Sequence, residues 1–159
     1  MTRTIRRELR FPRPPDAVWR ALTDAAVLAQ WMYPNDFEAR VGHRFTFRVP
    51  PNPMLGDGLV VRCEVLSCVP PRELEFTWVV GELDTRVRYS LEPDGEGTVV
   101  RFEHAGFVPD PAFAGAGYGW ETMHRQLGAV LRGIARELQG EGQLIQCQIG
   151  LQRLCIKRK

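Results

Sequence analysis

One amphipathic segment, from Tyr118 to Gln139, most constrains what this chain can fold into. Apolar residues recur in it at the three- and four-residue spacing that places them on one face of a helix. A helix of about 20 residues is roughly 30 Å long, about the width of a small domain. An apolar face of that length needs a large partner surface, and we expect a sheet that wraps around the helix. The apolar residues are Trp120, Met123, Leu127, Val130, Leu131, Ile134 and Leu138.

The chain before this helix alternates apolar and polar residues in the manner of β-strands. For example, Leu74, Phe76 and Trp78 alternate with Glu75 and Thr77. One face of each strand is apolar and the other is polar or charged, which is typical of an antiparallel sheet covered on one side. The expected strands are residues 4–11, 37–40, 43–49, 59–69, 74–80, 85–92 and 98–104, of which 37–40 and 43–49 form a hairpin that turns at Val41 and Gly42.

Two short helices are expected after the first strand. Prolines at positions 12, 14 and 15 end that strand, and a proline fits the first turn of a helix. The first helix is expected over residues 16–22, and Thr23 or Asp24 can cap the second. Before the long helix, residues 110–111 can cap a short turn, and glycines at 115, 117 and 119 predict a flexible entry. These elements together predict an α+β fold.

Composition sets limits on function. At 159 residues, with 44% hydrophobic and 25% charged residues, the chain has the ordinary make-up of one globular domain. A net charge of +2 without a recognised motif argues against nucleic-acid binding. No apolar run has the length of a membrane span, and the N-terminus lacks the apolar core of a secretory signal. We therefore expect a cytoplasmic protein with no membrane span.

The four cysteines predict free thiols rather than disulfides or a metal site. Cys63 and Cys68 would face opposite sides of a regular strand, and Cys147 and Cys155 have no histidine near them in the sequence. No motif for nucleophilic catalysis or phosphate binding is present. We expect no catalytic set, no metal and no cofactor.

The inward-facing aromatic residues suggest a ligand pocket between the sheet and the long helix. Small-molecule pockets are mostly apolar with a few placed polar groups. The alternative is that the same side chains simply fill the core, and the two readings carry about equal weight. The predicted lining residues are Phe47, Phe76, Trp78, Tyr89, Phe102 and His104 from the sheet, and Trp120, Met123 and Leu127 from the helix.

Polar candidates for this pocket are Tyr89, His104 and Arg7. His104 is the only histidine that the alternation places inward, and His124 is expected at the edge of the helix's apolar face. A general base near neutral pH is often a histidine, but no carboxylate partner is placed beside His104, so a structural, hydrogen-bonded role is favoured. Arg7 falls on an apolar strand face, where it lies either at a strand end, which is favoured, or at a cavity.

Several stretches of the sequence resemble a known superfamily. Residues 15–24, with Leu28 and Trp31, resemble the opening of the helix-grip proteins, which include birch-pollen-allergen-like, lipid-transfer and polyketide-cyclase proteins. Residues 31–34, 41–45, 70–78, 97–98, 104–107 and 119–120 are similar to one bacterial branch. That branch is related to the C-terminal domain of the activator of the 90-kDa heat-shock chaperone's ATPase.

The resemblance covers roughly residues 1–139 and implies a β-α-α-β6-α fold, a curved antiparallel sheet that grips one C-terminal helix. It provides no catalytic set for this chain. Residues 140–159 depart from it and form a C-terminal tail. Three alternatives for this tail are an added strand, a dimer arm or a disordered end.

Three functions fit these observations. The first is binding of a small hydrophobic or aromatic molecule without catalysis. The second is a co-chaperone-like protein-interaction domain with a chaperone or another protein as partner. The third is a cyclase- or hydrolase-like enzyme that uses His104 and Tyr89. Two-fold dimers are the commonest assembly among soluble oligomers, which is the one ground for expecting a homodimer here.

Overall fold

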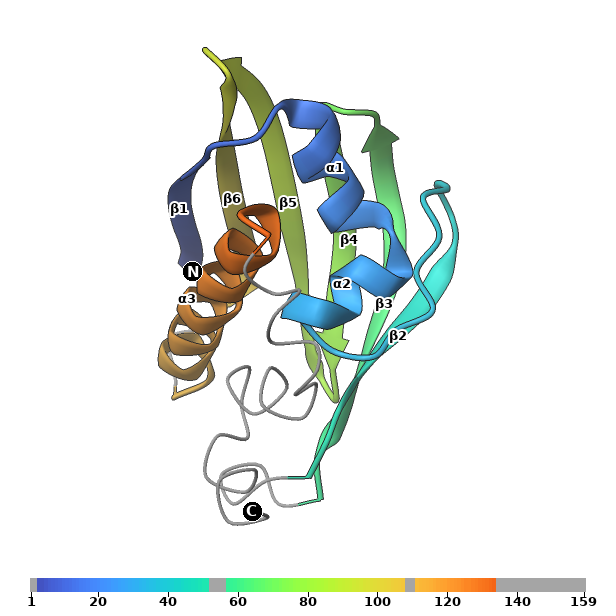
Figure 1. Cartoon of the computed structure of the whole chain (residues 1–159). Helices are drawn as coiled ribbons and strands as arrows, with labels where there is room; N and C mark the ends of the chain where they lie inside the picture. Colours follow the sequence, from blue (N-terminus) through green and yellow to red (C-terminus); the bar gives the residue numbers. More distant parts are fainter. Residues whose placement is uncertain (1–2, 52–56, 108–110, 134–159) are drawn as a thin grey trace, which may run out of the picture.

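A computed structural model describes residues 3–51, 57–107 and 111–133 of the chain (Figure 1). One strand, two short helices, five further strands and a long helix follow each other along the sequence. The elements are β1 (Arg3–Phe11), α1 (Pro15–Thr23), α2 (Ala25–Trp31), β2 (Arg44–Val49), β3 (Leu59–Val69), β4 (Glu73–Val80), β5 (Leu83–Asp94), β6 (Gly97–Phe107) and α3 (Pro111–Leu131).

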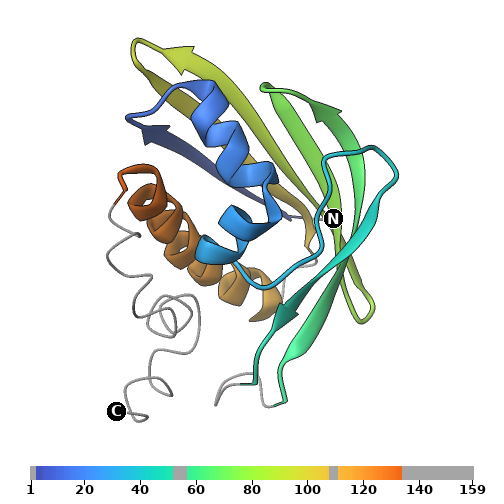
Figure 2. The same cartoon turned by 45° about the vertical axis from the view of Figure 1, so that its right-hand side comes forward.

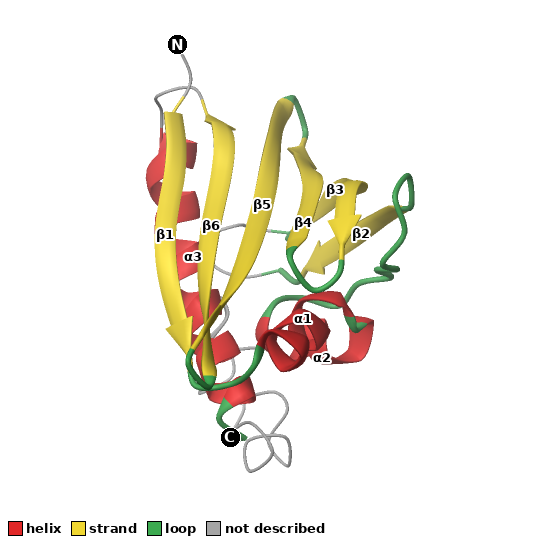
Figure 3. Ribbon diagram, turned by 90° about the horizontal axis from the view of Figure 1, so that it is seen from above, coloured by secondary structure: helices red, strands yellow, loops and turns green. Residues whose placement is uncertain are grey.

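The strands form one antiparallel sheet in the order β1-β6-β5-β4-β3-β2, so the first strand pairs with the last. From β2 to β6 each strand pairs with the next, as the turn signals in the sequence predict. The sheet curves, and the three helices lie on its inner side (Figures 2 and 3). The predicted α+β architecture is confirmed.

Strand alternation places the core on this inner face. Val87 and Tyr89 of β5 and Phe102 of β6 are each at most 1% exposed, whereas the arginines between them on the strands are exposed. On the outer face these arginines pair with carboxylates, for example Arg88 with Glu73 across β5 and β4. The predicted assignment of faces is therefore confirmed for these strands.

The predicted hairpin over residues 37–40 and 43–49 is wrong. Only Arg44–Val49 forms a strand, and its ladder partner is β3. The chain before β2 instead crosses the free edge of that strand, where the Arg48 N–H donates to the Pro34 carbonyl at 3.0 Å. A single bridge joins Asn35 to Phe47. The described sheet consequently has six strands, one fewer than the β-α-α-β6-α arrangement that the resemblance implied.

Both short helices form as the sequence predicts, and α1 extends one residue beyond the predicted range 16–22 at each end. Asp24 is confirmed as the cap of α2, because its Oδ1 accepts hydrogen bonds from the Ala26 and Val27 N–H groups. The helix pair is tied together by Trp31, whose indole N–H donates to the Ala21 carbonyl at 2.8 Å.

The bounds of the long helix differ from the prediction at both ends. It begins at Pro111 and runs through the glycines at 115, 117 and 119, so the separate turn and flexible entry are wrong. Each glycine lowers helix propensity by about 1 kcal/mol relative to alanine, but packing against the sheet overrides propensity. The helix ends at Leu131, because Gly133 adopts a left-handed φ of 81°. The predicted continuation over residues 134–139 and the tail over 140–159 lie outside the described residues.

Candidate functional site

The structure brings the nine predicted lining residues into one cluster between α3 and the sheet. Ring contacts run without a break from Phe76 and Phe47 through Trp78 and Trp120 to Phe102 and Tyr89, with centroid distances of 4.7 to 6.4 Å. His104 joins at Trp78 and Trp120, and Met123 and Leu127 lie buried in the same core. Eight of the nine are at most 4% exposed, and Trp78 is half-buried. That a ligand binds among them stays a prediction.

A directed chain of hydrogen bonds fixes His104. The Trp120 indole N–H can only donate, and it lies 2.7 Å from His104 Nδ1, which must therefore accept. The single proton of the neutral imidazole is then on Nε2, 2.6 Å from Thr85 Oγ1. The Thr85 hydroxyl in turn donates to the Trp78 carbonyl at 2.7 Å.

Both ring nitrogens of His104 are thus occupied by protein partners. Burial lowers the pKa of His104 to about 3, so the ring is neutral at physiological pH. A general base needs a free lone pair aimed at its substrate, and here the lone pair is taken by Trp120. The arrangement agrees with the structural, hydrogen-bonded role expected for this histidine.

A second histidine is buried that the sequence pattern had not placed in the core. His124 is 6% exposed, so its expected position at the helix edge, with His104 as the sole inward histidine, is wrong. Its ring stacks on Trp120 and meets Phe102 edge-on, at centroid distances of 5.4 and 4.6 Å. The helical spacing of the sequence does indicate burial of His124. Position 124 lies four residues after Trp120 and three before Leu127, on the buried face of the helix.

His124 pairs with Tyr89 in the middle of the cluster. The Tyr89 hydroxyl lies 2.9 Å from His124 Nε2. Burial raises the pKa of Tyr89 well above its ordinary value, and burial, with the nearby charge of Arg7, lowers the pKa of His124 to about 3. Both groups are therefore neutral. His124 Nδ1 is buried and has no hydrogen-bond partner among the described residues.

Arg7 lies beside this pair, in the middle of β1 and opposite Phe102 in the strand register. The favoured strand-end position is therefore wrong. By alternation it belongs to the inner face, between the buried Ile5 and the half-buried Leu9. Its Nη2 is 3.9 Å from the place where a Cβ on Gly117 would lie, so the guanidinium reaches α3 at a residue without a side chain.

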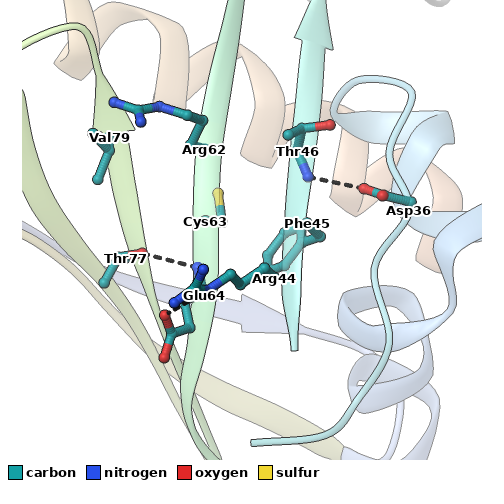
Figure 4. Close-up of a pocket in the computed structure, with 9 residues that line it drawn as sticks. All are labelled: Asp36, Arg44, Phe45, Thr46, Arg62, Cys63, Glu64, Thr77 and Val79. Atoms are coloured by element: carbon teal, nitrogen blue, oxygen red, sulfur yellow. Dashed lines mark hydrogen bonds and ion pairs between the residues drawn. The ribbon is translucent and has the colours of Figure 1, made fainter. Parts of the chain in front are cut away.

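A separate pocket of about 420 Å³ lies over β2, β3 and β4 (Figure 4). None of the nine predicted residues lines it. Between Arg62–Val79 and Val65–Phe76 the ladder of β3 and β4 is interrupted, and the Glu64 N–H donates to the Thr77 hydroxyl at 2.8 Å. The lining residues are Asp36, Arg44, Phe45, Thr46, Arg62, Cys63, Glu64, Thr77 and Val79.

This pocket is ill suited to thiol or metal chemistry. Burial first, and the charge of Asp36 second, raise the pKa of the Cys63 thiol, which keeps it protonated and weakly nucleophilic. Within residues 3–51, 57–107 and 111–133, no three His, Cys, Asp or Glu side chains are grouped to hold a metal ion. Cys63 and Cys68 are both free thiols, as predicted.

The architecture defines the class of protein: a curved antiparallel sheet around one long C-terminal helix, with two short helices after the first strand, is the helix-grip fold. The sequence profile of the Activator of Hsp90 ATPase homolog 1-like proteins matches residues 12–132, and the chain belongs to this family. The resemblance found in the sequence is confirmed. No curated protein matches the chain in sequence. In the described part of the chain, no helix is long and apolar enough to cross a membrane.

Solved structures share this fold. Protein MLL2253 of Mesorhizobium loti is 34% identical, with a TM-score of 0.74 over 82% of this chain and 97% of that one. CalU16 of Micromonospora echinospora is 28% identical, with a TM-score of 0.69 over 93% of this chain and 88% of that one. DynU16, from the dynemicin biosynthetic locus, is 23% identical with a TM-score of 0.69 over 81% of this chain and 47% of that one, which shows the fold alone.

The His104 hydrogen-bond chain predicts the effect of replacing Thr85 by valine. The substitution keeps the shape of the side chain but leaves the His104 Nε2–H and the Trp78 carbonyl without their partner. We expect the free energy of unfolding to fall by about 1–3 kcal/mol, measured by urea denaturation. Thr46→Val, the same change on the outer face, is the control and should cost less. Equal stability of the two variants would contradict the hydrogen-bond chain.

The two neutral histidines predict that mild acid destabilises the protein. In the folded state each pKa is about 3, whereas an unfolded histidine titrates near 6.5. The unfolded chain therefore binds more protons between these values, so this stability is complete above pH 6.5 and is lost progressively as the pH falls toward 3. We expect a loss of about 2 kcal/mol per histidine between pH 7 and pH 5.

Urea denaturation at the two pH values measures this loss. His124→Gln removes one of the two groups, so its loss should be about half as large. A free energy of unfolding that does not change between pH 7 and pH 5 in the unsubstituted protein would show that the histidines are not buried and neutral.

Proposed function

We propose that this protein binds a small hydrophobic or aromatic molecule between the sheet and α3, without catalysing a reaction. The observation that carries the proposal is the aromatic cluster that reaches from the half-buried Trp78 to the buried Tyr89–His124 pair. Its composition, many rings and few polar groups, is that of small-molecule sites in proteins. Membership of the helix-grip class supports a ligand-binding or cyclase-like domain by fold-level analogy only.

The geometry gives less support to an enzyme that uses His104 and Tyr89. His104 has no free ring nitrogen, and Tyr89 is neutral and engaged with His124 rather than with His104. A reaction through this pair would first require the Trp120–His104 hydrogen bond to break. The cytoplasmic location and the homodimer stay predictions from the sequence.

Tryptophan fluorescence tests the proposal, because Trp78 and Trp120 lie inside the cluster. The purified protein is titrated with methyl 2-naphthoate and with a panel of lipids, flavonoids and polyketide-like aromatics. We expect a saturable change with at least one of them. In Met123→Trp, which places a larger ring in the core, we expect affinity to fall at least about tenfold, a loss of about 1.4 kcal/mol.

Val60→Trp is the matched control, since it adds the same ring at a position that is 44% exposed. It should bind like the unsubstituted protein. If the folded protein responds to no compound of the panel, the proposal fails and a protein-interaction role becomes the leading hypothesis. If Met123→Trp binds as tightly as Val60→Trp, the ligand lies elsewhere.

A further inference from the structure

The Tyr89–His124 pair contains a polar group that its described surroundings do not satisfy. The tyrosine hydroxyl carries one proton, and the neutral imidazole carries one. If the hydroxyl donates to Nε2, the ring proton is on Nδ1, which has no partner among the described residues. If Nε2 donates instead, both Nδ1 and the hydroxyl proton lack a hydrogen-bond partner among the described residues. The first arrangement leaves fewer groups unpaired, so Nδ1 is a free N–H donor.

An unpaired donor in this position is costly, because the rings of Trp120, Phe102 and Tyr89 surround it. Leaving a buried donor without a hydrogen-bond partner costs about 1–3 kcal/mol. An acceptor atom on a bound molecule would recover that free energy. His104, by contrast, offers nothing to a ligand, since both of its nitrogens are already paired.

The charges around the pair indicate which kind of acceptor fits. Arg7 is the inner-face cation of β1, and its Nη1 donates to the Arg6 carbonyl, while none of the described carboxylates forms an ion pair with it. Its neighbours on the strand, Arg6 and Glu8, face outward, where Arg6 pairs with Glu103 and Glu8 with Arg10. The inner face beside His124 is therefore positive and without a counter-charge in the described residues.

The same cation lies against α3 at a residue about two helical turns before His124. The backbone of Arg7 pairs with Phe102, the residue whose ring contacts His124. Its guanidinium lies against Gly117, seven residues before His124 and so on the same face of α3. A group that reached His124 from this side would pass the guanidinium.

We propose that the ligand is an apolar carboxylic acid whose carboxylate accepts a hydrogen bond from His124 Nδ1–H and is balanced by the charge of Arg7. This inference rests on the proposed function and specifies the chemistry of its ligand. The neutral imidazole supplies direction, and the arginine supplies the counter-charge. Hydrogen bonds that involve an ionised partner are the stronger ones, so the acid should bind better than a neutral compound of the same shape.

The test compares 2-naphthoate with methyl 2-naphthoate, which share the ring system and differ in charge. Dissociation constants are measured at pH 7 by tryptophan fluorescence. We expect the unsubstituted protein to prefer the acid at least about tenfold. His124→Phe keeps a planar ring but removes the donor, and Arg7→Met keeps the chain length but removes the charge. Each should weaken binding of the acid and leave binding of the ester nearly unchanged.

Arg6→Met is the matched control, because it removes the same charge from the outer face of the same strand. It should keep the preference for the acid. Arg7→Met also covers the case in which His124→Phe does not fold, since Arg7 is exposed.

Equal affinity for acid and ester in the unsubstituted protein would overturn the inference while the proposed function stands. So would a preference that survives both His124→Phe and Arg7→Met. If neither naphthalene compound binds and the wider panel also gives no response, the proposed function itself has failed, and the inference falls with it.

Discussion

The rest of this structure depends on the burial of one face of α3 against the inner face of the sheet. Trp120 is at the centre of that contact: its indole touches Trp78 and Phe102, stacks with His124 and donates a hydrogen bond to His104. A large aromatic side chain contributes most through the apolar area that it removes from water, and its N–H must find an acceptor when buried. Trp120 meets both needs at once. The sheet has to curve to bring β4 and β6 to the same indole, and the two short helices close the space that the curve leaves beside α3.

This dry contact also determines the chemistry of the polar groups inside it. Removing an imidazole from water disfavours its charged form, which is why burial lowers the pKa of His104 and of His124 to about 3. Neutral histidines are useful as directional donors and acceptors and poor as sources of charge. The charge in the region comes from the edge strand β1, where Arg7 keeps its guanidinium near solvent while reaching the helix. Directional hydrogen bonds therefore come from the histidines, and the positive charge comes from Arg7.

Much of the fold could be predicted because its signals are local. The alternation in residues 59–69 gave the bounds of β3 correctly, and Asp24 could be identified as a cap from its side chain and position. The non-strand conformation of residues 37–40 could not be predicted in this way. Phe37 is buried by an edge-on contact with Phe45 rather than by strand pairing. The start of α3 was missed because its glycines are poor helix formers and the packing that overrides them is non-local. At the site, the aromatic cluster followed from strand faces, whereas the Tyr89–His124 pair required the register between α3 and β5.

The two buried histidines show why packing and binding can be separated within one core. Each lies against Trp120 and each bonds a hydroxyl of β5, Thr85 or Tyr89. His104 has a second polar partner, the indole N–H, so both of its ring nitrogens are paired. His124 has no such partner on Nδ1 in the described structure. Because the free energy of unfolding of a domain is small, a cost of about 1–3 kcal/mol for an unpaired donor is a substantial fraction of it. The acidic ligand that we propose would supply the acceptor that His124 Nδ1 lacks, whereas the packing of the described residues does not supply one.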